Sequence, residues 1–375
     1  MTLFIEPYRK PHEHMMVVQS LLLLESSRNE TIYFLTTKDY FDSIPVYCKE
    51  KVNFIEINNL NFSGRLQILD IFYFVFKYSR KLNPSRIILL SSKSYASLLI
   101  KIWTLVSSNR RNIYILLHGE LQYLINANTL SKKLDAFTNK INFRLNNCLI
   151  SNLNFVILSN LVFENLCTYL GYNLRNVIHL DLPYDYTNQL FNINPAKNSN
   201  KLILSTIGVN AVNKNSHFLN FLADNLKKEI DKSLIELKCI GRVHDVVFRD
   251  SVSLLNLEGS YFVDPVLYSK SILESSFILS FVDDNNYSLV SSGSYFDCIK
   301  YQKPILALRN SQWIYNFEKF GEIGILFNSV NEMLQYIFSI IDKPDEAFKF
   351  NSNLKEALLL TGIDNNLLNY KKLLT

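Results

Sequence analysis

Short apolar runs alternate with longer amphipathic segments along almost the whole chain, and this alternation constrains the fold more than any other feature. Such runs are typical of strands buried on both faces of a parallel sheet, and the segments between them have the length of helical crossovers. In the first half the predicted strands are Leu3–Ile5, Thr31–Leu35, Val52–Ile57, Arg86–Leu90, Asn112–Leu117, Phe155–Leu158 and Val177–Leu182. This half therefore predicts a doubly wound α/β domain.

A second α/β series follows a polar interruption, Pro183 to Asn200. Its predicted strands are Lys201–Thr206, Leu234–Ile240, Tyr261–Val263, Phe277–Phe281, Pro304–Leu308 and Ile323–Leu326. The 375 residues suffice for two domains of ordinary size. We therefore expect a first domain over 1–186, a linker over 187–200, a second domain over 201–350, and a helical segment over 351–375 that packs back on the first domain.

The composition and charge narrow the class of protein. A hydrophobic content of 48% with 19% charged residues describes a globular protein with sizeable cores. A net charge of +5 is too small for a dedicated nucleic-acid binder. Basic residues nonetheless gather in the first half, interleaved with Tyr and Phe: Lys77, Arg80, Lys81, Arg86, Lys101, Arg110, Arg111, Lys132, Lys133 and Lys140. They predict either a peripheral contact with anionic lipid or ordinary solvated helix faces.

Several features predict a cytoplasmic protein, with the membrane contact at the inner face of the cytoplasmic membrane. The five cysteines are scattered and form no CxxC pair, as in a reduced protein with buried thiols. The N-terminal residues lack the basic-then-apolar layout of a signal peptide, and no segment has the length of a membrane span.

Three loops at the predicted carboxyl ends of strands in the second domain suit an anion. Their glycine, serine and basic residues are Gly208 and Lys214, then Gly241 and Arg242, then Ser292, Gly293 and Ser294. The last loop opens a helix, where unpaired backbone N–H groups and the helix dipole attract phosphate. The two cations can pair with a diphosphate, and the glycines permit close approach of the backbone. Tight turns with exposed cations and a plain helix cap are the alternative reading.

With these loops, the stretch from Ser292 to Leu308, SGSYFDCIKYQKPILAL, resembles the sugar-nucleotide-binding domain of GT-B glycosyltransferases. In many of them an acidic residue lies seven positions before the proline of a G-x-P-V-I strand and binds the ribose of the donor. Asp297 and Pro304 have this spacing here, with Gln302 in place of the usual glycine. Retaining members carry a second glutamate eight positions earlier, where this chain has Leu289, so the resemblance slightly favours inverting chemistry.

The resemblance implies two Rossmann-like doubly wound parallel-sheet domains that face a central cleft. It implies that Asp297 contacts ribose and that Val263 and Tyr287 join the phosphate-binding loops around the donor. The sequence has no Asp-x-Asp motif, so no metal and no other cofactor is expected beside the nucleotide-sugar. Phosphate charge would then be met by Lys214, Arg242 and helix N-termini.

The catalytic base is expected in the first domain, which resembles the acceptor half of the same fold. His12, Glu13 and His14 follow the first strand, where some bacterial surface-polysaccharide transferases carry a similar His-Glu pair. His118 and Glu120 flank Gly119 at the end of another strand and are the alternative bases. The alternative for the first group is that Glu13 only stabilises the start of a helix. The alternative for the second group is that Gly119 only forms a turn.

The resemblance implies a glycosyltransferase of bacterial surface-polysaccharide synthesis. It would move a sugar from a nucleotide-sugar to a saccharide or lipid-linked saccharide. A sugar-nucleotide epimerase of the same fold and a non-catalytic α/β protein that binds a small anion are the alternatives. Walker, G-x-G-x-x-G, HExxH and G-x-S-x-G motifs are absent from the sequence.

Overall fold

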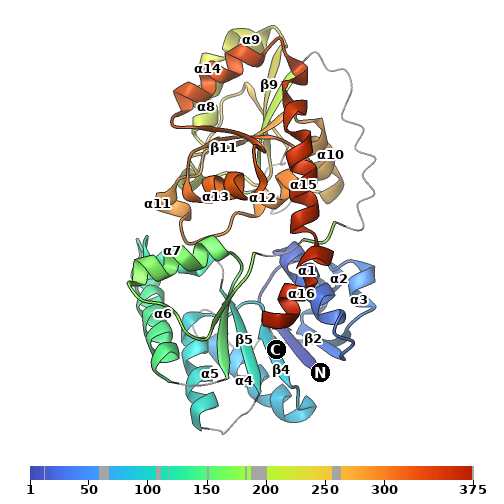
Figure 1. The fold of residues 1–375 in the computed structure, drawn as a ribbon, viewed down its shortest axis with the longest axis vertical. Helices are drawn as coiled ribbons and strands as arrows, with labels where there is room; N and C mark the ends of the chain where they lie inside the picture. Colours follow the sequence, from blue (N-terminus) through green and yellow to red (C-terminus); the bar gives the residue numbers. More distant parts are fainter. Residues whose placement is uncertain are drawn as a thin grey trace. The chain divides into compact units, whose positions relative to one another are not determined.

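The computed structural model describes residues 1–11, 13–58, 67–106, 111–117, 119–149, 152–181, 184–186, 201–255 and 263–373. The described chain forms two compact α/β units (Figure 1). Unit 1 contains Met1–Asp185, Leu289–Ser291 and Thr361–Thr375, and unit 2 contains Tyr186–Ser288 and Ser292–Leu360. The chain therefore passes from one unit to the other at four places.

Unit 1 is built on a parallel seven-stranded sheet with the order β3-β2-β1-β4-β5-β6-β7 among its described residues. The strands are β1 Thr2–Glu6, β2 Ile32–Thr36, β3 Asn53–Glu56, β4 Arg86–Leu89, β5 Asn112–Leu117, β6 Leu153–Ile157 and β7 Val177–His179. The order reverses between β1 and β4, which makes the sheet doubly wound. The prediction of a doubly wound first half is confirmed.

Helices cover both faces of this sheet. They are α1 Met15–Ser26, α2 Lys38–Asp42, α3 Val46–Lys49, α4 Gln67–Leu82, α5 Ser94–Val106, α6 Leu130–Cys148, α7 Asn160–Leu170 and α16 Ile363–Leu373, with a 3₁₀ turn η2 at Gly119–Leu124. One continuous core joins side chains of α4, α5, α6 and α7 to one sheet face. α1 and α16 pack against each other, near the two ends of the described chain (Figure 1).

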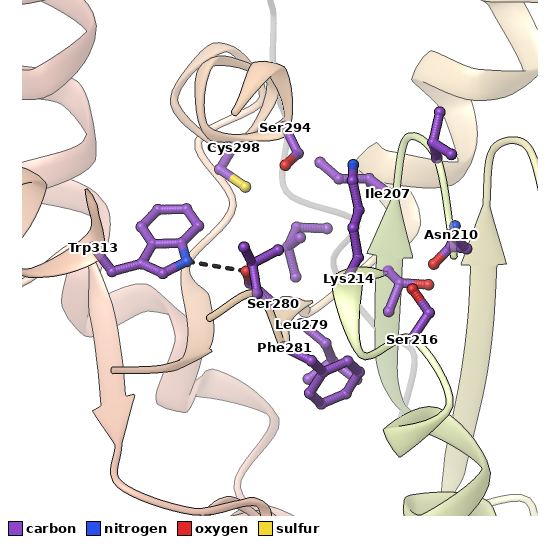
Figure 2. A pocket seen from close by; sticks show the side chains of 14 residues that line it. Ile207, Asn210, Lys214, Ser216, Leu279, Ser280, Phe281, Ser294, Cys298 and Trp313 are labelled. Carbon is purple, nitrogen blue, oxygen red and sulfur yellow. Dashed lines mark hydrogen bonds between the residues drawn. The ribbon is translucent and has the colours of Figure 1, made fainter. Parts of the chain in front are cut away.

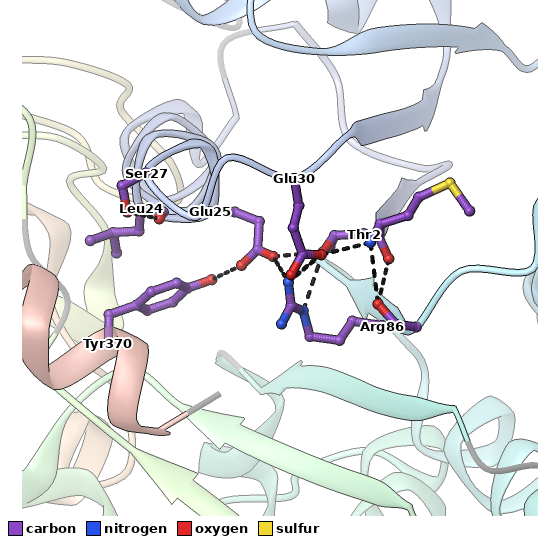
Figure 3. Close-up of polar contacts among 9 residues, drawn as sticks. Thr2, Leu24, Glu25, Ser27, Glu30, Arg86 and Tyr370 are labelled. Atoms are coloured by element: carbon purple, nitrogen blue, oxygen red, sulfur yellow. Dashed lines mark hydrogen bonds and ion pairs between the residues drawn. The ribbon is translucent and has the colours of Figure 1, made fainter. Parts of the chain in front are cut away.

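A buried polar network ties α16 to the body of unit 1 (Figure 3). The Glu25 carboxylate on α1 is fully buried, and it accepts hydrogen bonds from Thr2 Oγ1 at 2.6 Å and from Tyr370 Oη at 3.1 Å. The Arg86 guanidinium lies 2.5 Å from the same carboxylate and 2.8 Å from that of Glu30. Removing one partner would leave a buried charge without compensation, so the network holds its members in one arrangement.

Unit 2 is built on a parallel six-stranded sheet with the order β10-β9-β8-β11-β12-β13 among its described residues. The strands are β8 Leu202–Ile207, β9 Ile235–Ile240, β10 Val252–Leu254, β11 Phe277–Ser280, β12 Ile305–Leu308 and β13 Gly324–Phe327. The order again reverses between the first and fourth strands, β8 and β11. Ligands of open α/β sheets bind beyond the strand carboxyl ends at this reversal.

The helices of unit 2 alternate with its strands. They are α8 Phe218–Asn225, α9 Lys227–Asp231, α10 Pro265–Glu274, α11 Asp284–Tyr287, α12 Gly293–Lys300, α13 Ser311–Phe320, α14 Val330–Ile340 and α15 Asn351–Thr361, with 3₁₀ turns η3 Val212–Lys214 and η4 Pro344–Phe350. The sequence did not predict α13 or β10. The expected strand Tyr261–Val263 lies outside the described residues except for Val263, which is not in a strand.

Two glycines bring the backbones after β8 and β9 into direct contact. Gly208 and Gly241 both have positive φ, 79° and 132°. A Cβ atom on Gly241 would lie 2.0 Å from the carbonyl oxygen of Gly208, which no side chain can tolerate. The following residues are then linked by hydrogen bonds from Asn210 N to Arg242 O and from His244 N to Asn210 O, each 2.8 Å.

Replacing Gly241 by alanine is expected to lower the free energy of unfolding by about 2 kcal/mol or more, because the new methyl group clashes with the Gly208 backbone. Gly293→Ala is the matched control, since a Cβ atom there meets nothing within 4 Å. Urea unfolding of both variants measures the difference. Equal stability of the two variants would show that the two backbones are not in contact.

Candidate functional site

A small pocket lies in unit 2 at the point where the strand order reverses (Figure 2). Its walls come from the loop after β8, from β11 and its carboxyl end, from the first turns of α12, and from α13. It encloses about 30 Å³, which is room for roughly two water molecules. Only a small group of a larger ligand would enter it.

Lys214 supplies the positive charge of this pocket. Its side chain extends from η3 toward the first turn of α12, where Ser294 lies (Figure 2). Desolvation lowers the pKa of Lys214 to about 8. Among the described residues, no carboxylate lies within ion-pair distance of Lys214 Nζ, and the ammonium lies over the ring of Tyr287, whose centroid is 5.5 Å away. The amine is therefore available to a ligand that carries negative charge.

The N-terminus of α12 faces the same pocket through Ser294. Ser292 is the N-cap residue, but its hydroxyl contacts Ser294 Oγ at 2.7 Å and does not cap the helix. Gly293 is exposed and opens the helix. The positive end of a helix dipole thus lies beside a lysine amine, and both favour an anion.

Two side chains at this edge of unit 2, one in the pocket lining and one beside it, were not predicted from the sequence. Trp313 on α13 donates a hydrogen bond from Nε1 to Ser280 Oγ at 3.0 Å (Figure 2). Asn215 has a left-handed conformation and donates from Nδ2 to Phe281 O and to Asp283 Oδ2, each at 3.1 Å. This amide ties the loop that carries Lys214 to the end of β11. The sequence pattern that indicates a helix around Trp313 is the amphipathic segment after Asn310. Asn310 is the N-cap residue of this helix, α13.

Asp297 lies on α12 and is paired inside unit 2. Its Oδ2 accepts a hydrogen bond from Tyr268 Oη at 2.9 Å. Desolvation raises the pKa of Asp297, while the positive charge of Lys300 and the hydrogen bond from Tyr268 oppose the rise. The same burial and the neighbouring carboxylate raise the pKa of Tyr268 well above its usual value. Asp297 is not in the lining of the pocket, although its neighbour Cys298 is.

The other predicted donor-binding residues are distributed around this edge of unit 2. Gly208 forms the close contact with Gly241 described above. Tyr287 lies against Lys214, and desolvation raises the pKa of its hydroxyl to about 12. Arg242 and Val263 are half-buried, and neither lines the pocket. The structure thus brings Lys214, Ser294 and Tyr287 together and leaves Arg242 and Val263 outside the group.

In unit 1 the reversal point of the sheet holds a buried ion pair that the sequence did not predict. Glu6 ends β1 and is 1% exposed, and Arg9 is 8% exposed. Arg9 Nε lies 3.2 Å from Glu6 Oε2, Arg9 Nη2 donates to Leu90 O at 2.7 Å, and Ser91 Oγ donates to Glu6 Oε1 at 2.5 Å. Arg9 Nη1 is buried and has no hydrogen-bond partner among the residues that the structure describes. Desolvation raises the pKa of Glu6, and Arg9 opposes this rise.

The predicted bases of unit 1 lie in the loops after β1 and β5. The Glu13 carboxylate accepts from the backbone N–H of Lys10 at 3.1 Å, so it stabilises its own loop. His14 is the N-cap residue of α1, with φ of 51°. The residue is exposed, and desolvation together with the positive charge of Arg9 lowers the pKa of His14 to about 4. The imidazole is therefore neutral at pH 7.

Glu120 is half-buried in η2, directly after β5. His12 and His118 lie outside the described residues. The described residues contain no group of three or more His, Cys, Asp or Glu side chains placed to hold a metal ion.

No protein-family model matches the sequence, and no curated protein matches it either. Solved structures do match over the whole chain. HepE from Anabaena in complex with UDP-glucose is similar with a TM-score of 0.65 and 12% identity, over 100% of this chain and 98% of that one. A glycosyltransferase from Rickettsia africae matches with a TM-score of 0.61 and 14% identity, again over 100% and 98%.

A UDP-GlcNAc 2-epimerase from Neisseria meningitidis bound to UDP-GlcNAc also matches, with a TM-score of 0.53 and 13% identity over the full length of both chains. At these identities the likeness defines the fold. The described residues form two parallel sheets of seven and six strands, each reversing after its first strand, and with this likeness they make the fold GT-B. The resemblance read from the sequence is confirmed at this level.

Proposed function

We propose that the protein is a glycosyltransferase that moves a sugar from a nucleotide-sugar donor to a saccharide or lipid-linked saccharide acceptor of bacterial surface-polysaccharide synthesis. The observation that carries the proposal is the amine of Lys214, which lies without a carboxylate partner among the described residues in the pocket at the reversal point of unit 2, beside the N-terminus of α12. A phosphate group satisfies both features. The GT-B fold of HepE, solved with UDP-glucose, supports this choice of ligand.

In this proposal the diphosphate of the donor is bound without a metal ion. Lys214 and the N–H groups of the first turn of α12 neutralise its charge, which increases further when the nucleotide leaves. In this arrangement one phosphoryl group lies at the mouth of the pocket beside Lys214, and the nucleoside extends along α12 toward Asp297. A carboxylate suits ribose because it accepts hydrogen bonds from both vicinal hydroxyls.

The transfer itself requires a base. The acceptor hydroxyl attacks the anomeric carbon as the bond to the diphosphate oxygen breaks, and its proton passes to the base. The candidates in the described residues are Glu13, Glu120 and His14; His14 is neutral at pH 7, but its lowered pKa makes it a weaker proton acceptor than an ordinary imidazole. His12 and His118 remain sequence predictions. Inverting chemistry is slightly favoured because Leu289 stands where retaining members have a glutamate.

A sugar-nucleotide epimerase is the second candidate, since the epimerase from Neisseria meningitidis matches the whole chain. It would use the same donor pocket without an acceptor. A panel of nucleotide-sugars, with and without saccharide and lipid-linked acceptors, separates the two. We expect release of nucleoside diphosphate only when an acceptor is present. Conversion of the free nucleotide-sugar to its epimer would contradict the transferase and establish the epimerase.

The bases can be tested with the same assay. Replacing the general base is expected to lower kcat by roughly 100-fold or more. The affinity for the donor is expected to stay unchanged. Glu13→Gln, Glu120→Gln and His14→Gln are compared, and only one is expected to show this loss. Full activity of all three would move the base to His12 or His118.

Asp297→Ala is expected to weaken nucleoside diphosphate binding about tenfold or more, because a carboxylate acceptor is lost, and to leave inorganic pyrophosphate binding unchanged. Tyr268→Phe is the matched control: it removes the internal partner of Asp297 but keeps the carboxylate. Calorimetric titration of each ligand gives the comparison. Equal loss for both ligands would mean that Asp297 only supports the fold.

A further inference from the structure

Helix α5 exposes a row of apolar side chains, although its Ser, Thr and Lys side chains are buried. Its buried residues are Ser94, Ala96, Ser97, Ile100, Lys101 and Thr104. Its exposed residues include Leu99 at 37%, Ile102 at 49%, Leu105 at 41% and Val106 at 80%. Helices on a globular surface normally turn their apolar side inward. Isolated exposed leucines need no explanation, but four on one side of one helix do.

The only charged residue of α5 is directed inward. Lys101 is 2% exposed, and its Nζ donates to Asn146 Oδ1 at 2.8 Å and to Leu149 O at 3.1 Å. These acceptors lie at the C-terminal end of α6, where a cation complements the helix dipole. The exposed side of α5 is thereby left without a charge.

The helices on either side of α5 carry exposed basic residues. α5 packs against both α4 and α6, and all three contribute to one core on one face of the unit 1 sheet. The exposed basic residues are Lys77, Arg80 and Lys81 on α4, and Lys133, Lys140 and Arg144 on α6. Leu69 and Tyr73 on α4 and Phe137 on α6 are exposed among them.

The acidic residues of α4 and α6 are wholly or partly buried. Asp70, the one acidic residue of α4, is fully buried. Asp135, the one acidic residue of α6, is half-buried and accepts a hydrogen bond from Ser94 Oγ at 2.9 Å. The outward sides of α4, α5 and α6, called here the three-helix face, therefore combine an apolar centre with basic flanks.

We propose that the three-helix face docks on the surface of an anionic lipid bilayer. The aliphatic side chains of α5 enter the boundary between headgroups and acyl chains, and the basic residues of α4 and α6 bind headgroup phosphates. A second copy of the chain fits poorly, because two such faces would bring like charges together. None of the described helices is long and apolar enough to cross a membrane, so this contact lies on the bilayer. It does not depend on the proposed transferase activity.

The experiment is sedimentation of the full chain with vesicles of phosphatidylglycerol or of phosphatidylcholine. We expect binding to phosphatidylglycerol, weakened by salt, and little binding to phosphatidylcholine. Lys133→Gln, Lys140→Gln and Arg144→Gln together are expected to weaken binding about 100-fold, since each cation contributes about fivefold. Ile102→Ser, Leu105→Ser and Val106→Ser together are expected to weaken it about tenfold or more.

The controls match these changes elsewhere on the surface. Lys227→Gln, Lys228→Gln and Lys232→Gln remove three exposed cations of unit 2, and Val247→Ser with Val266→Ser removes two exposed apolar groups. Neither is expected to change vesicle binding. The proposal is overturned if the wild-type chain does not bind phosphatidylglycerol vesicles or if it binds both lipids equally. It is also overturned if the variant without Lys133, Lys140 and Arg144 binds as well as its control. Concentration-dependent dimerisation lost in the α5 variant would assign the face to a second copy instead.

Discussion

The backbones of Gly208 and Gly241 meet at the carboxyl ends of β8 and β9 with no space for a side chain, and the placement of the pocket depends on this contact. Asn210 follows it and joins the two loops by backbone hydrogen bonds in both directions. Asn215 then ties the same loop to the end of β11. Lys214 lies between these two attachments, so its amine is held at the reversal point of the sheet although it has no ion-pair partner of its own among the described residues.

The strand order reverses between the first and fourth strands of each sheet, but the charged groups at the two reversal points differ. In unit 1 the buried charges of Glu6 and Arg9 compensate each other and are held by Ser91 and the carbonyl of Leu90. In unit 2 the cation faces a pocket and a helix N-terminus. A compensated ion pair stabilises a loop, whereas an uncompensated amine with a lowered pKa is arranged for a ligand. This difference is why we propose the donor site in unit 2.

Much of the fold could be predicted because the strands of parallel sheets are apolar throughout and are separated by crossover helices. The same rule predicts that Lys214 and Ser294 lie at one edge of the sheet, since each follows the carboxyl end of a strand. Partnerships between distant residues could not be predicted: nothing in the sequence links Glu6 to Ser91, or Trp313 to Ser280. The burial of Lys101 could not be predicted either, because α5 is apolar on more than one side and its sequence pattern does not show which side faces the core.

Titration of nucleoside diphosphates at pH 7 and pH 9 tests the central claim most directly. With a pKa of about 8, Lys214 is mostly protonated at the lower pH and mostly neutral at the higher one. Binding requires the charged form, so affinity is predicted to fall about tenfold as the pH rises. Lys214→Arg should bind equally at both values, and Lys214→Met should bind weakly at both. Wild-type affinity in Lys214→Met for UDP, GDP and ADP alike would contradict the account.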